Sequence, residues 1–344
     1  MKAITLALLL LTQLSIAADS KKRTDFSVMT YNLENLFDTK HDLGKKDWTY
    51  LPLRFKQSSK EVQAYCRELS QWYQKSCFEL DWNQNVLDKK ISNLARVIRT
   101  HKDGADVLVF QEVENINALT QLVSKKLNGL GYREIVLIEG PDSRGIDVAI
   151  VSKFPLISKR YHQISLAPHS DRTTRGILEA VFSVRGKSIA VMANHWPSQA
   201  NSDLTRMEAA KVLLSAAAKV RADYVVAAGD FNTTTDDDIN ALKLKIEPAF
   251  IDTEIYGSAK SAPGTHWYKG EWESLDKIYL LKQKNNMTVS EHKIIFEKFM
   301  LKDERWVDDE TGARRFDSDI PNRFDPETGF GYSDHLPAVT TFRL

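Results

Sequence analysis

Short polar motifs that directly follow apolar runs are the residues of this chain best suited to chemistry. Each motif begins where a strand is expected to end, so its side chains leave the core and face a cleft. The motifs supply histidine, carboxylate and asparagine side chains but no cysteine. They are Tyr31-Asn32, Gln111-Glu112, Asn194-His195, Gly229-Asp230-Phe231-Asn232, Ser274-Leu275-Asp276 and Ser333-Asp334-His335.

The donor types in these motifs predict the kind of metal that they could hold. Carboxylate and amide oxygens are ligands that Mg²⁺, Mn²⁺ and Ca²⁺ prefer, whereas zinc more often uses closely spaced histidine and cysteine. Imidazoles, with an ordinary pKa of about 6.5, exist in both protonation states near neutral pH. The set therefore predicts a divalent cation beside two ionisable rings. Any one motif alone is better explained as a turn or a helix cap.

The histidine motifs have two other interpretations. Ser333, Asp334 and His335 contain the residue types of a serine hydrolase, but adjacent residues cannot assemble a catalytic triad. The sequence also has no Gly-x-Ser-x-Gly turn, so this hydrolase class is excluded. His195, beside Trp196 and Pro197, is equally consistent with a packed core histidine when it is considered without its neighbours.

Apolar periodicity predicts the elements that must position these motifs. Strands are expected at residues 26–31, 107–110, 134–138, 148–152, 178–184, 189–193, 224–228, 275–280, 293–296 and 338–342. Helices are expected at residues 87–98, 118–127 and 204–220. Because strands follow one another directly as well as across helices, mixed sheets are favoured over a purely parallel one. Residues 303–332 are expected to form a long polar loop.

The N-terminus and the length predict the domain organisation. The apolar run that begins at Ala3 is shorter than the roughly 20 residues of a membrane span, and it ends in small residues. We expect a signal peptide at residues 1–18, cleaved after Ala17 or Ala18, and export to a periplasm or to the medium. Residues 24–344 are expected to form a single domain with a surface insert at about 38–83.

Cys66 and Cys77 are the two cysteines of the chain, and both lie in this insert. In an exported protein, two nearby cysteines are better explained by a disulfide than by a metal site. Two free, buried thiols are the alternative.

Composition and charge leave several functions open. The 42% hydrophobic and 27% charged residues are typical of a globular protein and argue against disorder on a large scale. A net charge of +1 gives no basic field over the whole molecule, which counts against a nucleic-acid substrate. Arginine-bearing loops could still form a local basic groove that follows a phosphate backbone, at Arg172, Arg175, Arg206, Arg314, Arg315 and Arg323.

The motifs and their order resemble the endonuclease/exonuclease/phosphatase family, which includes DNase I, abasic-site endonucleases, bacterial sphingomyelinases and inositol-polyphosphate phosphatases. The likeness runs from Phe26 to the C-terminus. It implies an α/β fold, a four-layer sandwich of two mixed β-sheets flanked by helices. The most specific pieces are Gly229-Asp230-Phe231-Asn232 and Ser333-Asp334-His335-Leu336-Pro337, supported by Asn32, Gln111-Glu112 and Gly145-Ile146-Asp147-Val148-Ala149-Ile150.

The resemblance also implies a metal and an attacking water. Glu112 and Asn32 look like the family's metal-binding pair, and Asp334 looks like a further carboxylate on the metal side. The implied ion is Mg²⁺, with Mn²⁺ or Ca²⁺ as alternatives. Asp230 and Asn232 occupy positions that, in the family, orient or activate the attacking water and hold the phosphate.

Further roles fall on the histidines and on two possible phosphate ligands. His335 and Asp276 resemble the family's His–Asp pair, in which the carboxylate fixes the imidazole. His195 stands where some branches have a second histidine, which makes it a candidate general acid. Asn194 and Arg144 are candidate phosphate-binding residues, although Arg144 is equally well explained as a solvated loop charge.

Three substrate classes fit the same residues: nucleic acid, phospholipid headgroups such as sphingomyelin, and soluble phosphate esters. Export and the arginine-bearing loops favour a nuclease that hydrolyses DNA or RNA. Exposed aromatic residues of the insert would suit a phospholipid surface. A non-catalytic binding module on the same fold is a further alternative. The sequence indicates no obligate protein partner.

Overall fold

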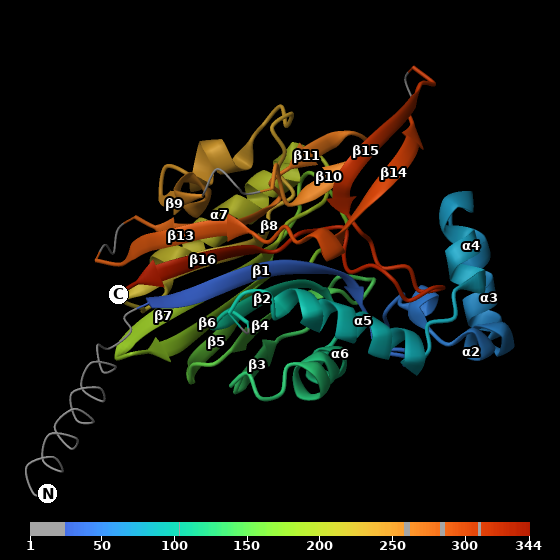
Figure 1. Ribbon diagram of the computed structural model, residues 1–344, viewed down its shortest axis with the longest axis horizontal. Helices are drawn as coiled ribbons and strands as arrows, with labels where there is room; N and C mark the ends of the chain where they lie inside the picture. The colour runs from blue at the N-terminus through green and yellow to red at the C-terminus, as the bar shows by residue number, and fades with distance from the viewer. Residues whose placement is uncertain (1–24, 103, 258–261, 283–285, 309–310) are drawn as a thin grey trace, which may run out of the picture.

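The chain folds into two six-stranded mixed sheets that stack face to face (Figure 1). The computed structural model describes residues 25–102, 104–257, 262–282, 286–308 and 311–344, so the expected signal peptide lies outside the described residues. The strand order is β13-β16-β1-β2-β4-β3 in the first sheet and β5-β6-β7-β8-β12-β9 in the second. Each sheet contains one parallel pair, β1 with β2 and β7 with β8, among antiparallel neighbours.

The strands of the two sheets have the following bounds. The first sheet contains β1 (Asp25–Leu36), β2 (Val107–Val113), β3 (Glu134–Leu137), β4 (Asp147–Ser152), β13 (Thr288–Ile294) and β16 (Ala338–Arg343). The second sheet contains β5 (Leu156–His162), β6 (Ile177–Val184), β7 (Lys187–His195), β8 (Tyr224–Asp230), β9 (Phe250–Asp252) and β12 (Asp276–Leu281).

Apolar side chains fill the spaces between four layers. Along β1, Phe26 and Val28 point into the core between the two sheets, while Met29 and Tyr31 point to the outer face of the first sheet. This alternation is the period of two expected of a strand buried on both sides. The predicted four-layer α/β sandwich is therefore confirmed.

Helices cover the outer faces of both sheets. The first sheet is covered by α5 (Gln84–Ile98), α6 (Ile116–Gln121) and the π-helical turn η2 (Leu122–Lys126), and the second by α7 (Asp203–Lys219) and the π-helical turn η3 (Leu242–Ile246). Short 3₁₀ turns are η1 (Trp48–Tyr50), η4 (Thr253–Tyr256) and η5 (Lys298–Met300). Within the described ranges, none of the helices has both the length and the apolar character to cross a bilayer.

Helices also occupy much of the segment predicted as a surface insert, at about residues 38–83. They are α2 (Leu53–Ser58), α3 (Lys60–Glu68) and α4 (Gln71–Glu79). A disulfide joins Cys66 of α3 to Cys77 of α4, so the predicted pairing is confirmed. Both cysteines lie in a small apolar cluster with Trp48, Leu51 and Val62. This local cluster, separate from the main cores, holds the helices together.

The prediction of a long loop at residues 303–332 is wrong for the part up to Pro321. The strands β14 (Leu301–Val307) and β15 (Arg314–Pro321) form an antiparallel hairpin there, and it stands away from the sheets (Figure 1). Most of its side chains stay in solvent, so it lacks the alternating apolar residues by which strands are recognised. Polar or short strands were missed for the same reason: β5, β9 and the hairpin of β10 (His266–Tyr268) with β11 (Glu271–Glu273).

Candidate active site

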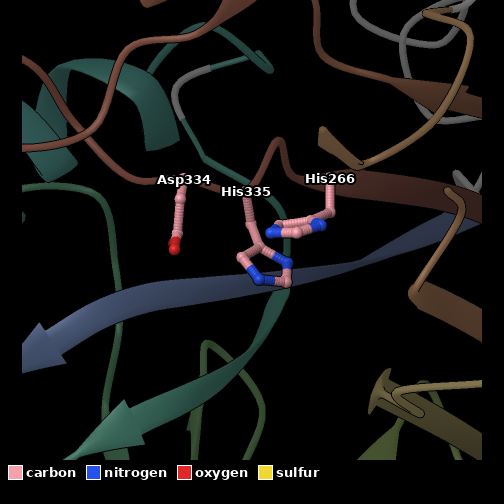
Figure 2. A group of neighbouring side chains, drawn as sticks. All are labelled: His266, Asp334 and His335. Carbon is pink, nitrogen blue, oxygen red and sulfur yellow. The ribbon is translucent and has the colours of Figure 1, made fainter. Parts of the chain in front are cut away.

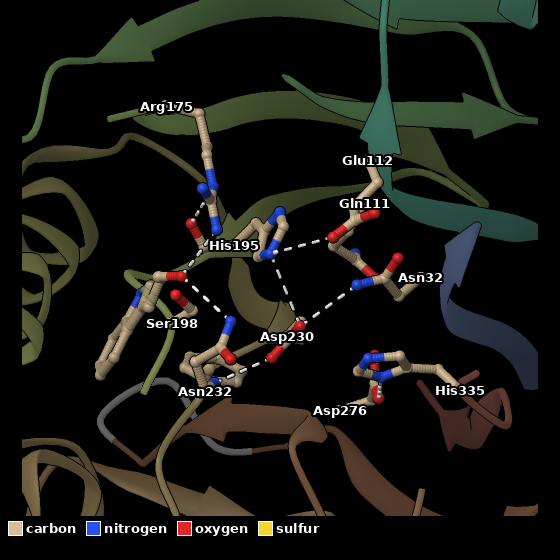
Figure 3. Close-up of polar contacts among 12 residues, drawn as sticks. Asn32, Gln111, Glu112, Arg175, His195, Ser198, Asp230, Asn232, Asp276 and His335 are labelled. Carbon is tan, nitrogen blue, oxygen red and sulfur yellow. Dashed lines mark hydrogen bonds and ion pairs between the residues drawn. The ribbon is translucent and has the colours of Figure 1, made fainter. Parts of the chain in front are cut away.

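Strand register assembles the centre of the site. In the second sheet, His195 at the end of β7 pairs with Asp230 at the end of β8, and Asp230 pairs with Asp276 at the start of β12. In the first sheet, Asn32 on β1 pairs with Gln111 on β2, next to Glu112. Residues from five separate motifs thus meet at one end of the stacked sheets, where their side chains point toward one another (Figure 3).

A glycine makes the close approach of β7 and β8 feasible. Gly229 has a φ of +147°, and a Cβ atom at this position would lie 2.0 Å from the carbonyl oxygen of Asn194. Any other residue would clash with backbone that cannot move aside. Gly229 therefore fixes the position of Asp230, which follows it directly.

Amide groups orient Asp230. The Nδ2 of Asn32 donates to Oδ2 of Asp230 at 3.2 Å, and the backbone N–H of Asn232 donates to Oδ1 at 2.9 Å. The Asn232 side chain donates in turn to the carbonyl oxygen of Trp196 at 3.1 Å. Burial is the main cause that raises the pKa of Asp230 to about 7, with a contribution from Asp276. Asp230 is thus a fixed carboxylate that can exchange a proton near neutral pH.

His195 is fully enclosed, with its Nε2 facing two carboxylates. This atom lies 3.6 Å from Oδ2 of Asp230 and 4.0 Å from Oε1 of Glu112, while Nδ1 has no hydrogen-bond partner. The buried guanidinium of Arg175 holds the backbone by donating to the carbonyl oxygens of His195 and Trp196, at 2.9 Å and 2.8 Å. Burial, reinforced by the charge of Arg175, lowers the pKa of His195 well below its usual value.

His335 and Asp276 form a close pair. The Nδ1 of His335 lies 2.6 Å from Oδ2 of Asp276, while Oδ1 of Asp276 is buried without a partner. Burial alone would lower the pKa of His335, but the negative charge of Asp276 and its hydrogen bond outweigh it and raise the pKa well above the usual value. The two shifts run in opposite directions and favour the charged form of His335 and the neutral form of His195, so the rings are not equivalent in proton transfer.

Glu112 adopts a left-handed backbone conformation, with a φ of +60°. One of its carboxylate oxygens accepts the backbone N–H of Asn35 at 2.9 Å, and the other faces His195. A non-glycine residue in this conformation carries strain and is often found at functional sites. The fixed carboxylate, with an oxygen turned to the cluster, fits a metal ligand.

The first sheet also brings in residues that the sequence analysis missed. Glu34 accepts hydrogen bonds from Nε of Arg323 at 2.7 Å and from the backbone of Phe324 at 3.1 Å. Burial raises the pKa of Glu34, and repulsion by Asp334 adds to this effect. Lys90 is buried and donates to the carbonyl oxygen of Glu34 at 2.8 Å. Two cations therefore partly offset a crowded group of carboxylates.

Asp334 lies at the edge of the cluster and belongs to a second group that could hold an ion. Its Oδ2 is 3.3 Å from a guanidinium nitrogen of Arg323. Potential ligand atoms of Asp334, His335 and His266 all lie within 4.8 Å of one another, and the two rings are tilted together with centroids 4.7 Å apart (Figure 2). His266 was not identified from the sequence, because it follows no predicted strand.

The predicted phosphate ligands lie outside the cluster. Asn194 is fully buried, and its amide donates to the carbonyl oxygen of Met192 and accepts from Nε1 of Trp196. Its geometry suits support of the backbone and gives its predicted phosphate role no support. Arg144 is exposed and lines a neighbouring cavity of about 600 Å³ together with Arg172.

The suggestion that six arginines could follow a phosphate backbone is wrong for two of them. Arg175 is enclosed behind His195, and Arg206 is fully buried between the carboxylates of Asp203 and Asp237. Both guanidinium groups are used inside the protein, since a buried cation needs such partners. Arg172, Arg314, Arg315 and Arg323 remain exposed.

The chain is similar to known proteins in sequence and in structure. A sequence profile described as the endonuclease/exonuclease/phosphatase family matches residues 73–343. No curated protein sequence matches the chain. A solved structure of a family protein from Bacteroides thetaiotaomicron is similar, with 13% identity over 92% of this chain and 97% of that chain and a TM-score of 0.54.

Two structures of D. rerio TDP2 are also similar. A humanized form has 16% identity, covers 93% of this chain and 100% of its own, and gives a TM-score of 0.56. A complex with a single strand DNA product has 16% identity, 93% and 99% coverage, and a TM-score of 0.53. At these identities the structural likeness establishes the fold alone.

Proposed function

Because the chain belongs to the endonuclease/exonuclease/phosphatase family, we propose that it is a metal-dependent phosphodiesterase that hydrolyses nucleic acid. The observation that carries the proposal is the continuous row of His195, Asp230 and Asp276 on adjacent strands, with His335 bound to the last. Every role needed for phosphate-ester hydrolysis has a candidate side chain in this row or next to it.

The donor set fits a hard divalent cation such as Mg²⁺. Glu112 presents a fixed carboxylate oxygen to the cluster. Burial raises the pKa of Glu34, and repulsion between Glu34 and Asp334 raises it further. A cation would relieve this repulsion. We therefore assign the metal to Glu112, with Asn32 and Asp334 as further ligands. When bound, the ion would neutralise charge on a non-bridging phosphate oxygen.

Asp230 is the residue best placed to accept a proton from the attacking water. The amides of Asn32 and Asn232 hold both of its oxygens, so the carboxylate cannot turn away. A cavity of about 470 Å³ reaches Asn232 and His335, which gives a water and a phosphate ester access to this end of the sheets. Fixing the base in this way favours in-line attack, because the reacting groups are already oriented.

The two histidines have different roles in this mechanism. His335 carries a positive charge, held by Asp276, and is suited to bind a phosphate oxygen as charge develops there. His195 is neutral in the free protein, so the predicted role of general acid requires that bound phosphate first raises its pKa. We assign His195 to hydrogen bonding of the phosphate.

Nucleic acid is favoured as the substrate by the charges around the site. The cavity lined by Arg144 and Arg172 adjoins Pro197 and Ser198, which directly follow the His195–Trp196 segment. An exposed guanidinium group can bind two oxygens of one phosphate at once. Arg144 and Arg172 would therefore hold a phosphate next to the one that is cleaved. A polynucleotide, which carries several phosphates, would bind more tightly through this second contact, whereas a single phosphate ester would not.

The substrate class can be tested directly. Purified protein is incubated with plasmid DNA, RNA, sphingomyelin vesicles and bis-p-nitrophenyl phosphate, first with Mg²⁺ and then with excess EDTA. We expect cleavage of a nucleic acid and of the small diester, and loss of both with EDTA. Cleavage of sphingomyelin alone would overturn the substrate, and binding of DNA without turnover of any ester would favour the non-catalytic binding module.

Export is part of the proposal, because residues 1–18 have the composition of a signal peptide. N-terminal sequencing of protein recovered from the medium or the periplasm should begin after Ala17 or Ala18. Recovery of the intact N-terminus from the cytoplasm would contradict export.

A further inference from the structure

A cavity of about 520 Å³ lies between α4 and the β14–β15 hairpin, beside the active site. Its volume is within the range of about 300–1,000 Å³ typical of sites for small organic groups. In Figure 1 the hairpin and α4 rise on the same side of the molecule. We call this cavity the aromatic cavity because its walls include Trp72, Trp267, Tyr268 and Trp306.

We propose that the aromatic cavity binds an unpaired nucleobase of the substrate, one nucleotide away from the phosphate that is cleaved. This inference rests on the proposed nuclease function and specifies its substrate as a single strand, whose bases are free to stack. Aromatic side chains bind bases of any sequence through their flat faces, and one such contact changes affinity by about tenfold or more.

One wall of the cavity is held in place by the fold. The ring of Trp306 packs so closely on Gly270 that a Cβ there would lie 2.8 Å from it, and Nε1 of Trp306 donates to Asp317. Trp267 packs edge-to-face against Trp306, with ring centroids 6.2 Å apart. These rings are therefore oriented before a ligand arrives, which reduces the entropy lost on binding.

The opposite wall carries an aromatic ring that a ligand could cover. Trp72 is 84% exposed, an unusual state for the largest apolar side chain. It projects from α4, which the disulfide between Cys66 and Cys77 ties to α3. A flat ring that enters the cavity would remove the face of Trp72 from water, so stacking and burial would both favour binding.

The aromatic cavity adjoins the active site. Asp334 and His266 line it, and His266 also lines the cavity that reaches Asn232 and His335. His266 and His335 are bridged through their backbones as well as in contact through their rings. A strand whose cleaved phosphate lies at His335 can therefore place the base of the adjacent nucleotide in the aromatic cavity.

The charges of the lining favour a neutral ring over a lipid headgroup. The cavity has two cationic side chains, Lys269 and Arg323, and two carboxylates, Glu304 and Asp334. It therefore has no net negative charge to attract a quaternary ammonium group, which aromatic cages bind as a cation. The exposed guanidinium of Arg323 can instead contact the phosphates of a nucleotide chain.

The test measures binding separately from turnover. Affinity for a fluorescent oligothymidylate and for a hairpin duplex of equal length is measured by anisotropy in EDTA, with and without phosphocholine as competitor. The variant is Trp72→Ala, which should not affect folding because the side chain is in solvent. The matched control is Phe330→Ala, an aromatic residue that is 75% exposed and is not part of this lining. Hydrolysis of bis-p-nitrophenyl phosphate with Mg²⁺ reports on the active site alone.

We expect Trp72→Ala to weaken single-strand binding by about tenfold, with duplex binding and small-diester hydrolysis unchanged. Phe330→Ala should behave as the wild type. Equal affinity of Trp72→Ala and wild type, no binding of the single strand, or displacement of the strand by phosphocholine would each overturn the subsite. Single-strand binding that depends on Trp72 but is followed by no hydrolysis would leave the subsite standing and overturn the nuclease.

Discussion

The Nδ1 of His335 lies 2.6 Å from Oδ2 of Asp276, and the second carboxylate oxygen of Asp276 has no partner. Asp276 is fully buried at the start of β12, so its charge is compensated mainly by this one imidazole. A buried carboxylate with a single cationic partner gains strongly from keeping that partner protonated. The pair therefore sets both the orientation and the charge of the ring that faces the active site.

Asp276→Asn should lower kcat by about 10²-fold or more, in the range of effects expected when one group that stabilises charge developing on the phosphate is lost. The asparagine can still accept a hydrogen bond, so the ring stays in place, but the cation loses its compensating charge. The pKa of His335, followed by NMR of its ring protons, should fall. Glu68→Gln, on the distant helix α3, serves as the control for removal of a carboxylate. An unchanged kcat together with a lowered His335 pKa would show that the charge of His335 is not used.

Gly229→Ala should destabilise the protein by more than Gly186→Ala. A Cβ at residue 229 would meet the carbonyl oxygen of Asn194 at 2.0 Å, whereas one at residue 186 meets nothing within 4 Å. Both glycines have positive φ, so Gly186→Ala measures the cost of backbone strain alone, about 1–2 kcal/mol. The extra loss for Gly229→Ala reports the clash together with the strain of its φ of +147°, and denaturant unfolding of the two variants measures it. Equal unfolding midpoints would mean that β7 and β8 can separate without cost.

Removal of the disulfide should loosen the insert and leave the sheets intact. Cys66 and Cys77 are 11 residues apart, and a loop of this length corresponds to about 3 kcal/mol of chain entropy in the simplest treatment. Cys66→Ser with Cys77→Ser should therefore raise amide exchange in α3 and α4, with no change in β1 or β8. Reduced wild type is the control for side-chain size. Faster exchange in the sheets would show that the insert supports the whole domain.

The centre of the site could be predicted from the sequence because its residues lie at strand ends. The end of an apolar run marks a strand end, and strand pairing then determines which ends are neighbours. Asn32, His195 and Asp230 each end an apolar run, and parallel pairing brings such ends together. Long-range packing decides the rest. Lys90 lies on the apolar face of α5 beside Leu87 and Ile91. A single lysine on an apolar helix face indicates a buried cation with a partner, so Lys90 could have been identified from the sequence.

Other members of the site left no local signal. Glu34 reaches the cluster because β1 bends, with φ of +49° at Glu34, and no sequence pattern specifies that bend. His266 follows no apolar run, and its backbone bridge to His335 brings it to the site. The side chains of Arg175 and Arg206 carry the same charge as an exposed arginine, so their burial could not be predicted from residue type.

Acid should destabilise the protein through His101, a residue outside the active site. The ring is buried with neither nitrogen hydrogen-bonded, and burial, with the nearby charges of Lys293 and Lys102, lowers its pKa to about 4. Above the unfolded pKa of about 6.5 the ring is neutral in both states and pH has no effect. As pH falls from 6.5 toward 4 the unfolded state takes up a proton that the folded state refuses, so stability is lost progressively, by up to about 3 kcal/mol.

His101→Leu removes this proton uptake and should flatten the dependence of unfolding free energy on pH between 4 and 6.5. The measurement is urea denaturation of wild type and variant across this range, at constant ionic strength because lysine charges contribute to the shift. His169→Leu is the control, since His169 is a partly exposed histidine in another loop. The unfolding free energies of wild type and His101→Leu should change with pH at the same rate above pH 6.5. Below it the two curves should diverge, with wild type losing stability faster. Parallel curves throughout would show that His101 can open to solvent and take up its proton in the folded state.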